Sequence, residues 1–139
     1  MEVSSKSTQE TKELAEKLAG RALPKDIYAL YGDLGSGKTT FTGFFVKSLG
    51  FDNRVQSPTF VIVRRYQRDT GSIKRVYHVD LYRLTKTAEL VDLGLEEMFS
   101  DNEAITIIEW PELLEGRLPA NSKKLHFSYV DENSRNIDV

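Results

Sequence analysis

The chain has 139 residues, 40% hydrophobic and 29% charged, a balance typical of one folded globular domain. It contains no cysteine, which excludes disulfide bridges and thiolate metal sites. A formal net charge of -2 excludes a general electrostatic attraction to nucleic acid. The apolar runs are shorter than the roughly 20 residues of a membrane-spanning helix, and the N-terminal segment lacks the order of a signal peptide. We therefore expect a single domain over residues 1–139, in the cytoplasm and with no membrane partner.

The N-terminal third predicts a helix, a buried strand and a second helix. Ser7 and Glu10 have the spacing of a capping box, and apolar residues at helical spacing follow as far as Gly20. The run DIYALYG, residues 26–32, has no polar alternation, which is typical of a strand covered on both faces. Residues 38–49 contain no proline and carry apolar side chains at helical spacing, so they predict the second helix.

The middle of the chain predicts a β-hairpin. Residues 59–67 and 72–82 are rich in β-branched and aromatic side chains, and the RDTG sequence at 68–71 between them is a turn signal. A turn centred between its second and third residues would place Thr59 opposite Asp80, within a residue or two.

The C-terminal half adds one helical segment and three strands. Residues 87–99 have a helical pattern interrupted by Gly94, which predicts a helix in two pieces. The apolar run 104–110 predicts a second buried strand. Residues 124–130 and 135–139 read as a terminal hairpin around a DENS turn.

The segment from Gly32 to Thr39 matches the phosphate-loop pattern G-x-x-x-x-G-K-[ST] at every fixed position. Its glycines allow a tight turn with inward-pointing backbone N–H groups, and the following helix adds a partial positive charge. Lys38 would reach the β- and γ-phosphates, while the Thr39 hydroxyl would help to hold Mg²⁺. Because the loop follows a buried-type strand and precedes a helix, the three segments are in the order that this motif requires, and the sequence predicts a phosphate-binding site here.

Two acidic residues compete for the metal role. Glu109 ends the buried strand 104–110, where it would reach the edge at which the loop opens. Asp80 ends the neighbouring strand pattern, and Thr59, if opposite it, could sense the γ-phosphate as a GTPase switch threonine does. A turn or capping role for Thr59 is an equal alternative.

Two other side chains near these acids have no assigned role. His78 lies within an alternating strand, where a packed or surface imidazole is the ordinary interpretation, and we assign it no catalysis. Trp110, which follows Glu109 directly, is either a contact aromatic or part of the core.

Several users of phosphate loops are disfavoured by the sequence. A GTPase would carry an Asn-Lys-x-Asp run, and a helicase or motor would need a second domain. A kinase for a small molecule remains the alternative, although it needs an arginine-bearing lid and an acceptor pocket. The preferred interpretation is a slowly hydrolysing, nucleotide-dependent module that switches a partner.

Short motifs follow one another along most of the chain: GDLGSGKTTF (32–41), SPTF (57–60), YHVDLYRL (77–84), EL and LGLEEMF (89–99), IIEWPE (107–112) and LP (118–119). In the identity, order and spacing of these motifs the chain resembles the bacterial TsaE family, the ATPases of tRNA N6-threonylcarbamoyladenosine (t6A) biosynthesis. The resemblance implies an α/β P-loop NTPase fold with a mixed parallel and antiparallel central sheet flanked by helices. It also implies a weak Mg²⁺-dependent ATPase that acts with the proteins TsaB and TsaD. Those partners would carry the threonylcarbamoyl transfer to adenosine 37, so contact with tRNA would be indirect.

The resemblance also implies roles for individual residues. It assigns Mg²⁺ to Thr39 and Glu109, and activity to Lys38, Asp80, Glu109 and Thr59, with Trp110 at a position tied to activity. Phosphate binding would fall to Leu34, Gly35, Ser36, Gly37, Lys38, Thr39 and Thr40. Further nucleotide contacts are expected near Thr8 and Arg135. The notable departure is Ser36, where alanine is common in the family.

Overall fold

A seven-stranded sheet with the order β1-β7-β6-β2-β5-β4-β3 forms the centre of the protein in the computed structural model, which describes residues 2–33, 35–51 and 63–139. The strands are β1 (Glu2–Ser5), β2 (Ile27–Tyr31), β3 (Val63–Gln67), β4 (Arg75–Asp80), β5 (Ala104–Glu109), β6 (Lys123–Tyr129) and β7 (Arg135–Asp138). The helices are α1 (Thr8–Ala19), α2 (Lys38–Ser48), α3 (Leu95–Phe99) and two 3₁₀ segments, η1 (Thr87–Leu93) and η2 (Pro111–Leu114). The predicted α/β fold with a mixed sheet is confirmed.

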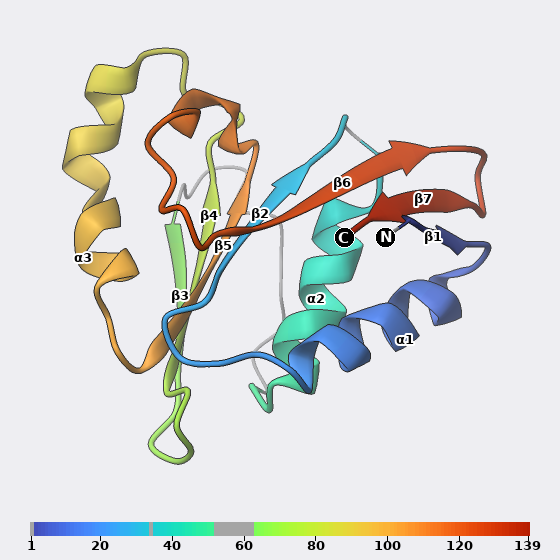
Figure 1. Ribbon diagram of the computed structural model, residues 1–139, viewed down its shortest axis with the longest axis horizontal. Helices are drawn as coiled ribbons and strands as arrows, with labels where there is room; N and C mark the ends of the chain where they lie inside the picture. Colours follow the sequence, from blue (N-terminus) through green and yellow to red (C-terminus); the bar gives the residue numbers. More distant parts are fainter. Residues whose placement is uncertain (1, 34, 52–62) are drawn as a thin grey trace.

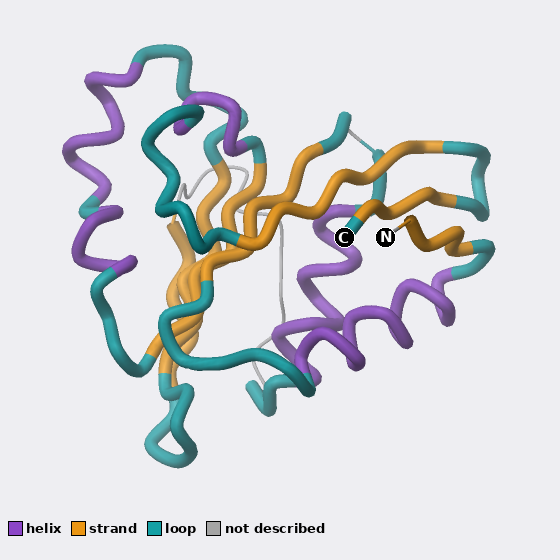
Figure 2. The backbone as a smooth tube through the Cα atoms, viewed as in Figure 1, coloured by secondary structure: helices purple, strands orange, loops and turns teal. Residues whose placement is uncertain are grey.

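The sheet is parallel in its middle and antiparallel at both sides. Strand β2 pairs in parallel with β5 and β6, and β4 pairs in parallel with β5. Antiparallel pairing adds β3 at one edge and β7 with β1 at the other. Figure 2 shows the two chain ends side by side, as the pairing of Glu2 with Asp138 requires.

Helices cover both faces of the sheet (Figure 1), with α1 and α2 on one face and the η1–α3 segment on the other. Each face has its own apolar cluster. The side chains of Leu30 and Ile107 pack with Phe41 and Phe45 of α2, whereas Ile108 belongs to the cluster of the opposite face. Strand β5 is buried along its whole length, because a central strand between two helical layers needs apolar side chains on both faces.

The predicted elements are present, with two corrections. Strand β1 was not predicted, since its sequence EVSS carries one apolar residue and gains its place only by pairing with β7. The hairpin register was also wrong: Val63 lies opposite Val79, whereas the predicted turn would have placed it opposite Val76. The connection between the two strands is longer than the predicted loop of residues 68–71. This is shown by the Arg68 N–H, which donates to the carbonyl of Lys74 at 2.9 Å.

Other sequence predictions agree with the structure at the level of single residues. Ser7 is the N-cap of α1, and its hydroxyl accepts from the N–H of Glu10. Gly94, with a φ of 71°, separates η1 from α3, so the helix does come in two pieces, the first a 3₁₀ helix. Within the described residues, no helix is long and apolar enough to cross a membrane.

The topology brings three strand ends to one place. Strands β2, β5 and β4 are parallel neighbours, so their carboxyl ends open on the same edge, where a ligand site is expected in such sheets. The loop after β2 leads directly into α2, which packs on this sheet. The phosphate loop and the acidic ends of β4 and β5 therefore meet at this edge.

Candidate nucleotide-binding site

The phosphate loop has the backbone conformation that its glycines predict. Gly32, Gly35 and Gly37 have φ values of 146°, 77° and 102°, which side chains other than glycine rarely adopt. A Cβ at Gly32 would lie 2.6 Å from the carbonyl oxygen of Phe127, so this turn also has no space for a side chain. Gly37 is the N-cap of α2, and the first N–H groups of a helix lack partners within it. The start of α2 is thus suited to receive an anion.

The predicted phosphate-binding loop includes Leu34 and Ser36. Leu34 lies outside the described residues. Ser36 is 1% exposed, and its hydroxyl has no hydrogen-bond partner among the described residues. Because this side chain faces the protein interior, any contact of Ser36 with phosphate would come from its backbone.

Lys38 is folded back against the protein. It is 5% exposed, its ammonium donates to the carbonyl oxygen of Gly32, and the same Nζ lies 3.6 Å from the centre of the Trp110 ring. Burial lowers the pKa of the Lys38 ammonium, and the negative charge of Glu109 opposes this shift. Because little water surrounds the Lys38 ammonium, its electrostatic attraction to a phosphate oxygen would be stronger than that of an exposed lysine.

Glu109 joins the loop to the sheet. Its side chain is nearly buried, at 2% residue exposure, and its Oε1 accepts from the Thr39 hydroxyl at 3.1 Å. The other oxygen, Oε2, lies 2.5 Å from Nε2 of His78. The two residues predicted to hold Mg²⁺ are therefore in direct contact, although they are 70 positions apart in the sequence.

Asp80 lies next to Glu109, and no hydrogen bond joins its described side chain to Thr39. It is the register partner of Glu109, and its Oδ1 accepts from the N–H of Tyr82 at 2.9 Å. Burial raises the pKa of the Asp80 carboxyl, and the neighbouring charge of Glu109 adds to this effect. Thr59, predicted to lie opposite Asp80, is outside the described residues.

The donor set fits Mg²⁺ held together with a nucleotide. Among the described residues, no three His, Asp or Glu side chains converge on one point that could hold a metal ion. Mg²⁺ in NTPase sites takes one or two protein ligands and completes its shell with phosphate oxygens and water. The Thr39 hydroxyl, whose proton goes to Glu109, keeps its lone pairs for such an ion.

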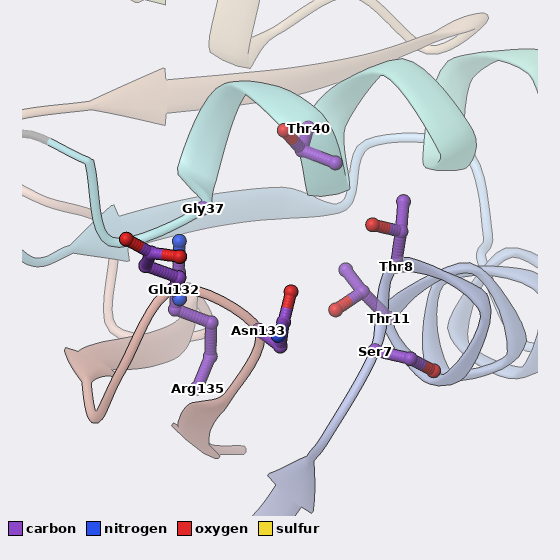
Figure 3. Close-up of a pocket in the computed structure, with 8 residues that line it drawn as sticks. All are labelled: Ser7, Thr8, Thr11, Gly37, Thr40, Glu132, Asn133 and Arg135. Atoms are coloured by element: carbon purple, nitrogen blue, oxygen red, sulfur yellow. The ribbon is translucent and has the colours of Figure 1, made fainter.

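A pocket of about 80 Å³ lies beside the start of α2 (Figure 3). Its lining comes from three places: the start of α1, the start of α2 and the turn between β6 and β7. The lining residues are Ser7, Thr8, Thr11, Gly37, Thr40, Glu132, Asn133 and Arg135. Thr8 and Arg135, the further nucleotide contacts expected near the two ends of the chain, thus line the same pocket as Gly37 and Thr40 of the loop.

Arg135 is fixed at the rim of this pocket. Its guanidinium donates to the carbonyls of Asp131 and Ser134 and lies 4.8 Å from the centre of the Tyr129 ring. The Cβ of a residue larger than glycine at position 37 would lie 3.6 Å from the Arg135 side chain. The arginine therefore packs directly against the phosphate loop.

Sequence reasoning missed the contact made by His78. This residue is 0% exposed and touches Glu109 on the neighbouring strand. Its spacing of two from Asp80 places both side chains on one face of β4, which was readable from the sequence. The position of β5 beside β4, which brings Glu109 to His78, was not readable from the sequence. The same holds for Trp110, whose contact with Lys38 depends on the sheet order.

These features define the class of protein: the fold and the strand-loop-helix site are those of a P-loop NTPase. The crystal structure of YdiB from Bacillus subtilis superposes with a TM-score of 0.78 at 31% identity, over 99% of this chain and 82% of that one. The pattern of the family described as threonylcarbamoyl adenosine biosynthesis protein TsaE matches residues 5–137. The chain belongs to the TsaE family.

Relatives with the name tRNA threonylcarbamoyladenosine biosynthesis protein TsaE are similar over most of their length. The one from Bacillus subtilis (strain 168) is 38% identical over 129 residues, which cover 93% of this chain and 78% of the relative. The one from Aquifex aeolicus is 34% identical over 140 residues, covering 99% and 94%. The recognition made from the sequence motifs is confirmed, and with it a place in t6A biosynthesis.

Proposed function

We propose that this protein is a weak Mg²⁺-dependent ATPase that works as a subunit of the machinery for t6A at position 37 of tRNA, together with TsaB and TsaD. The observation that carries the proposal is the contact between Thr39 and Glu109 at the start of α2. In P-loop NTPases a hydroxyl and a carboxylate at these places hold the metal ion against the phosphates.

The roles of the loop residues follow from this arrangement. Lys38, now held by the Gly32 carbonyl and the Trp110 ring, would turn to the β- and γ-phosphates. When bound, Mg²⁺ would neutralise phosphate charge and orient the γ-phosphate. Glu109 would orient Thr39 and the ion, and Asp80 would add negative charge at the same edge.

The adenosine would lie toward the pocket that Thr8, Thr40 and Arg135 line. Ligand pockets that enclose a molecule measure roughly 300–1,000 Å³, and this one measures about 80 Å³. We therefore propose that the nucleoside rests across the rim between α1 and the β6–β7 turn (Figure 3), while the phosphate loop provides most of the affinity.

Hydrolysis is tested with purified protein, Mg²⁺ and ATP labelled at the γ-phosphate. Slow release of inorganic phosphate is expected, with loss of nucleotide binding in Lys38→Ala and no loss in the control Lys47→Ala, which is exposed at the other end of the same helix. Label that appears only on a small-molecule acceptor would support the kinase alternative instead.

The partner role is tested separately, by pull-down with TsaB and TsaD in the presence and absence of ATP. Association that depends on nucleotide, and that Lys38→Ala abolishes, is the expected result. Association that is equal in both conditions would contradict the switch while leaving the ATPase proposal in place.

A further inference from the structure

His78 is a fully buried imidazole on β4, two residues before this strand ends at Asp80. Strand β4 lies between β3 and β5, and the residues paired with His78 on these strands are Arg64 and Ile107. The Nε2 of His78 lies 2.5 Å from Oε2 of Glu109. A buried polar side chain that touches a buried carboxylate is a costly arrangement unless the hydrogen bond is made well.

Both oxygens of Glu109 are engaged in the structure. Oε2 meets His78 at 2.5 Å, and Oε1 accepts from the Thr39 hydroxyl at 3.1 Å. A carboxylate held at both oxygens has one orientation in which both bonds persist. The His78 contact therefore selects the orientation that directs Oε1 at Thr39.

The arrangement assigns the donor to His78. A carboxylate oxygen accepts, so Nε2 carries the proton. The other ring nitrogen, Nδ1, is buried and has no hydrogen-bond partner among the described residues. One donor toward Glu109 is thus the contact that the imidazole makes with this site.

We infer that His78 is a positioning residue that holds Glu109 toward Thr39 and thereby sets the affinity of the site for Mg²⁺ in the nucleotide complex. The inference rests on the proposed Mg²⁺–nucleotide site. Hydrogen-bonded neighbours of metal-binding side chains typically contribute a factor of about 10 to 100 in metal affinity.

Three variants distinguish positioning from packing. His78→Phe keeps a ring and removes the donor, whereas His78→Gln restores an N–H donor at about the same distance along the side chain. His126→Phe is the matched control, because His126 is the other histidine of the chain and stacks on Tyr31 instead of touching Glu109.

Each protein is saturated with ADP and titrated with Mn²⁺, and binding is measured from the electron paramagnetic resonance signal of the free ion. Affinity for ADP without metal and thermal unfolding are recorded for each variant. His78→Phe is expected to weaken Mn²⁺ binding by about 10- to 100-fold, with metal-free ADP binding unchanged, and His78→Gln to recover most of the loss. The control should match the wild type.

The outcomes separate this inference from the proposed function. Equal Mn²⁺ affinity in His78→Phe and wild type, or equal loss in the Phe and Gln variants, overturns the positioning role alone. A wild-type protein whose ADP complex binds no Mn²⁺ overturns the metal site and the positioning role together.

A second measurement uses the wild-type protein alone, so it does not depend on whether a variant folds. Nitrogen-15 spectra of the ring nitrogens in the nucleotide-free wild-type protein contain signals from two histidines. A proton bonded to Nε2 of His78, shifted downfield by a strong hydrogen bond, is expected. A proton on Nδ1 instead would overturn the assignment of the donor, and with it the inference.

Discussion

The Lys38 ammonium lies 3.6 Å from the centre of the Trp110 ring, a distance at which the cation is attracted by the face of the indole. The Trp110 backbone is in the left-handed region, with φ 58° and ψ 55°, directly after the end of β5. Its ring also contacts Tyr82, with centroids 4.9 Å apart. The lysine predicted to bind phosphate thus has an aromatic partner in Trp110.

Nucleotide binding is therefore expected to change the tryptophan fluorescence. If Lys38 turns to the phosphates, the indole loses its cation, and Trp110 is the only tryptophan of the chain. Titration with ADP should give a saturable change in emission, which Lys38→Met should abolish. Saturable ADP binding measured by calorimetry with constant emission would show that Lys38 stays on the ring.

Glu109 and Asp80 should have different effects when neutralised. Glu109→Gln removes the charge that contacts Thr39, so ATP hydrolysis should fall by more than about 10-fold, as for loss of one preorganised electrostatic group. Asp80→Asn should cause the smaller loss, because the Thr39 hydroxyl donates to Glu109 and not to Asp80. Both variants should still bind ADP without metal. A larger effect at Asp80 would move the main metal role to that residue.

Arg135 should contribute to nucleotide affinity. Arg135→Met keeps most of the side-chain length but removes the guanidinium that lines the pocket beside Gly37. Hydrogen bonds to charged groups contribute about 1.5–3 kcal/mol, so ADP binding measured by calorimetry should weaken by about 10- to 100-fold. Arg117→Met, at an exposed position outside the pocket, is the control. Equal affinity in the two variants would remove Arg135 from the site.

Acid should destabilise the protein through Asp101. Arg75 donates to both oxygens of this carboxylate, at 2.6 and 2.9 Å, and Tyr77 donates at 2.8 Å. These bonds, that of Arg75 first, hold the pKa of Asp101 well below its usual value. The native state then binds fewer protons than the unfolded state between the two pKa values. This stabilisation is therefore complete above roughly pH 4–5 and is lost progressively as the pH falls below that range toward the lowered pKa of Asp101.

Asp101→Asn should lower the free energy of unfolding at pH 7 by about 1–3 kcal/mol and make the acid limb of the stability curve less steep. Urea unfolding at pH 3 to 7 measures both. Asp69→Asn, in the exposed turn after β3, should leave the curve unchanged. ADP binding should persist in both variants, since Asp101 precedes β5 and the site follows it. An unchanged acid limb in Asp101→Asn would show that other carboxylates dominate.

The sequence by itself determined the local parts of this protein. The phosphate loop, the Ser7 cap and the break at Gly94 depend on residues a few positions apart, where backbone preferences and helix capping act. The buried strands were predictable because central strands need apolar side chains on both faces. Family membership was predictable because its motifs are short and ordered along the chain.

Only the tertiary structure decided which of these parts touch. That Thr39 meets Glu109, that His78 holds the other oxygen of Glu109, and that Trp110 covers Lys38 all follow from the order of β2, β5 and β4 in the sheet. Strand order is set by the packing of whole faces and by long-range pairing, as it is for β1 beside β7. Such contacts leave no periodic signal in the neighbouring sequence, so the local elements were predictable while most contacts between the candidate site residues were not.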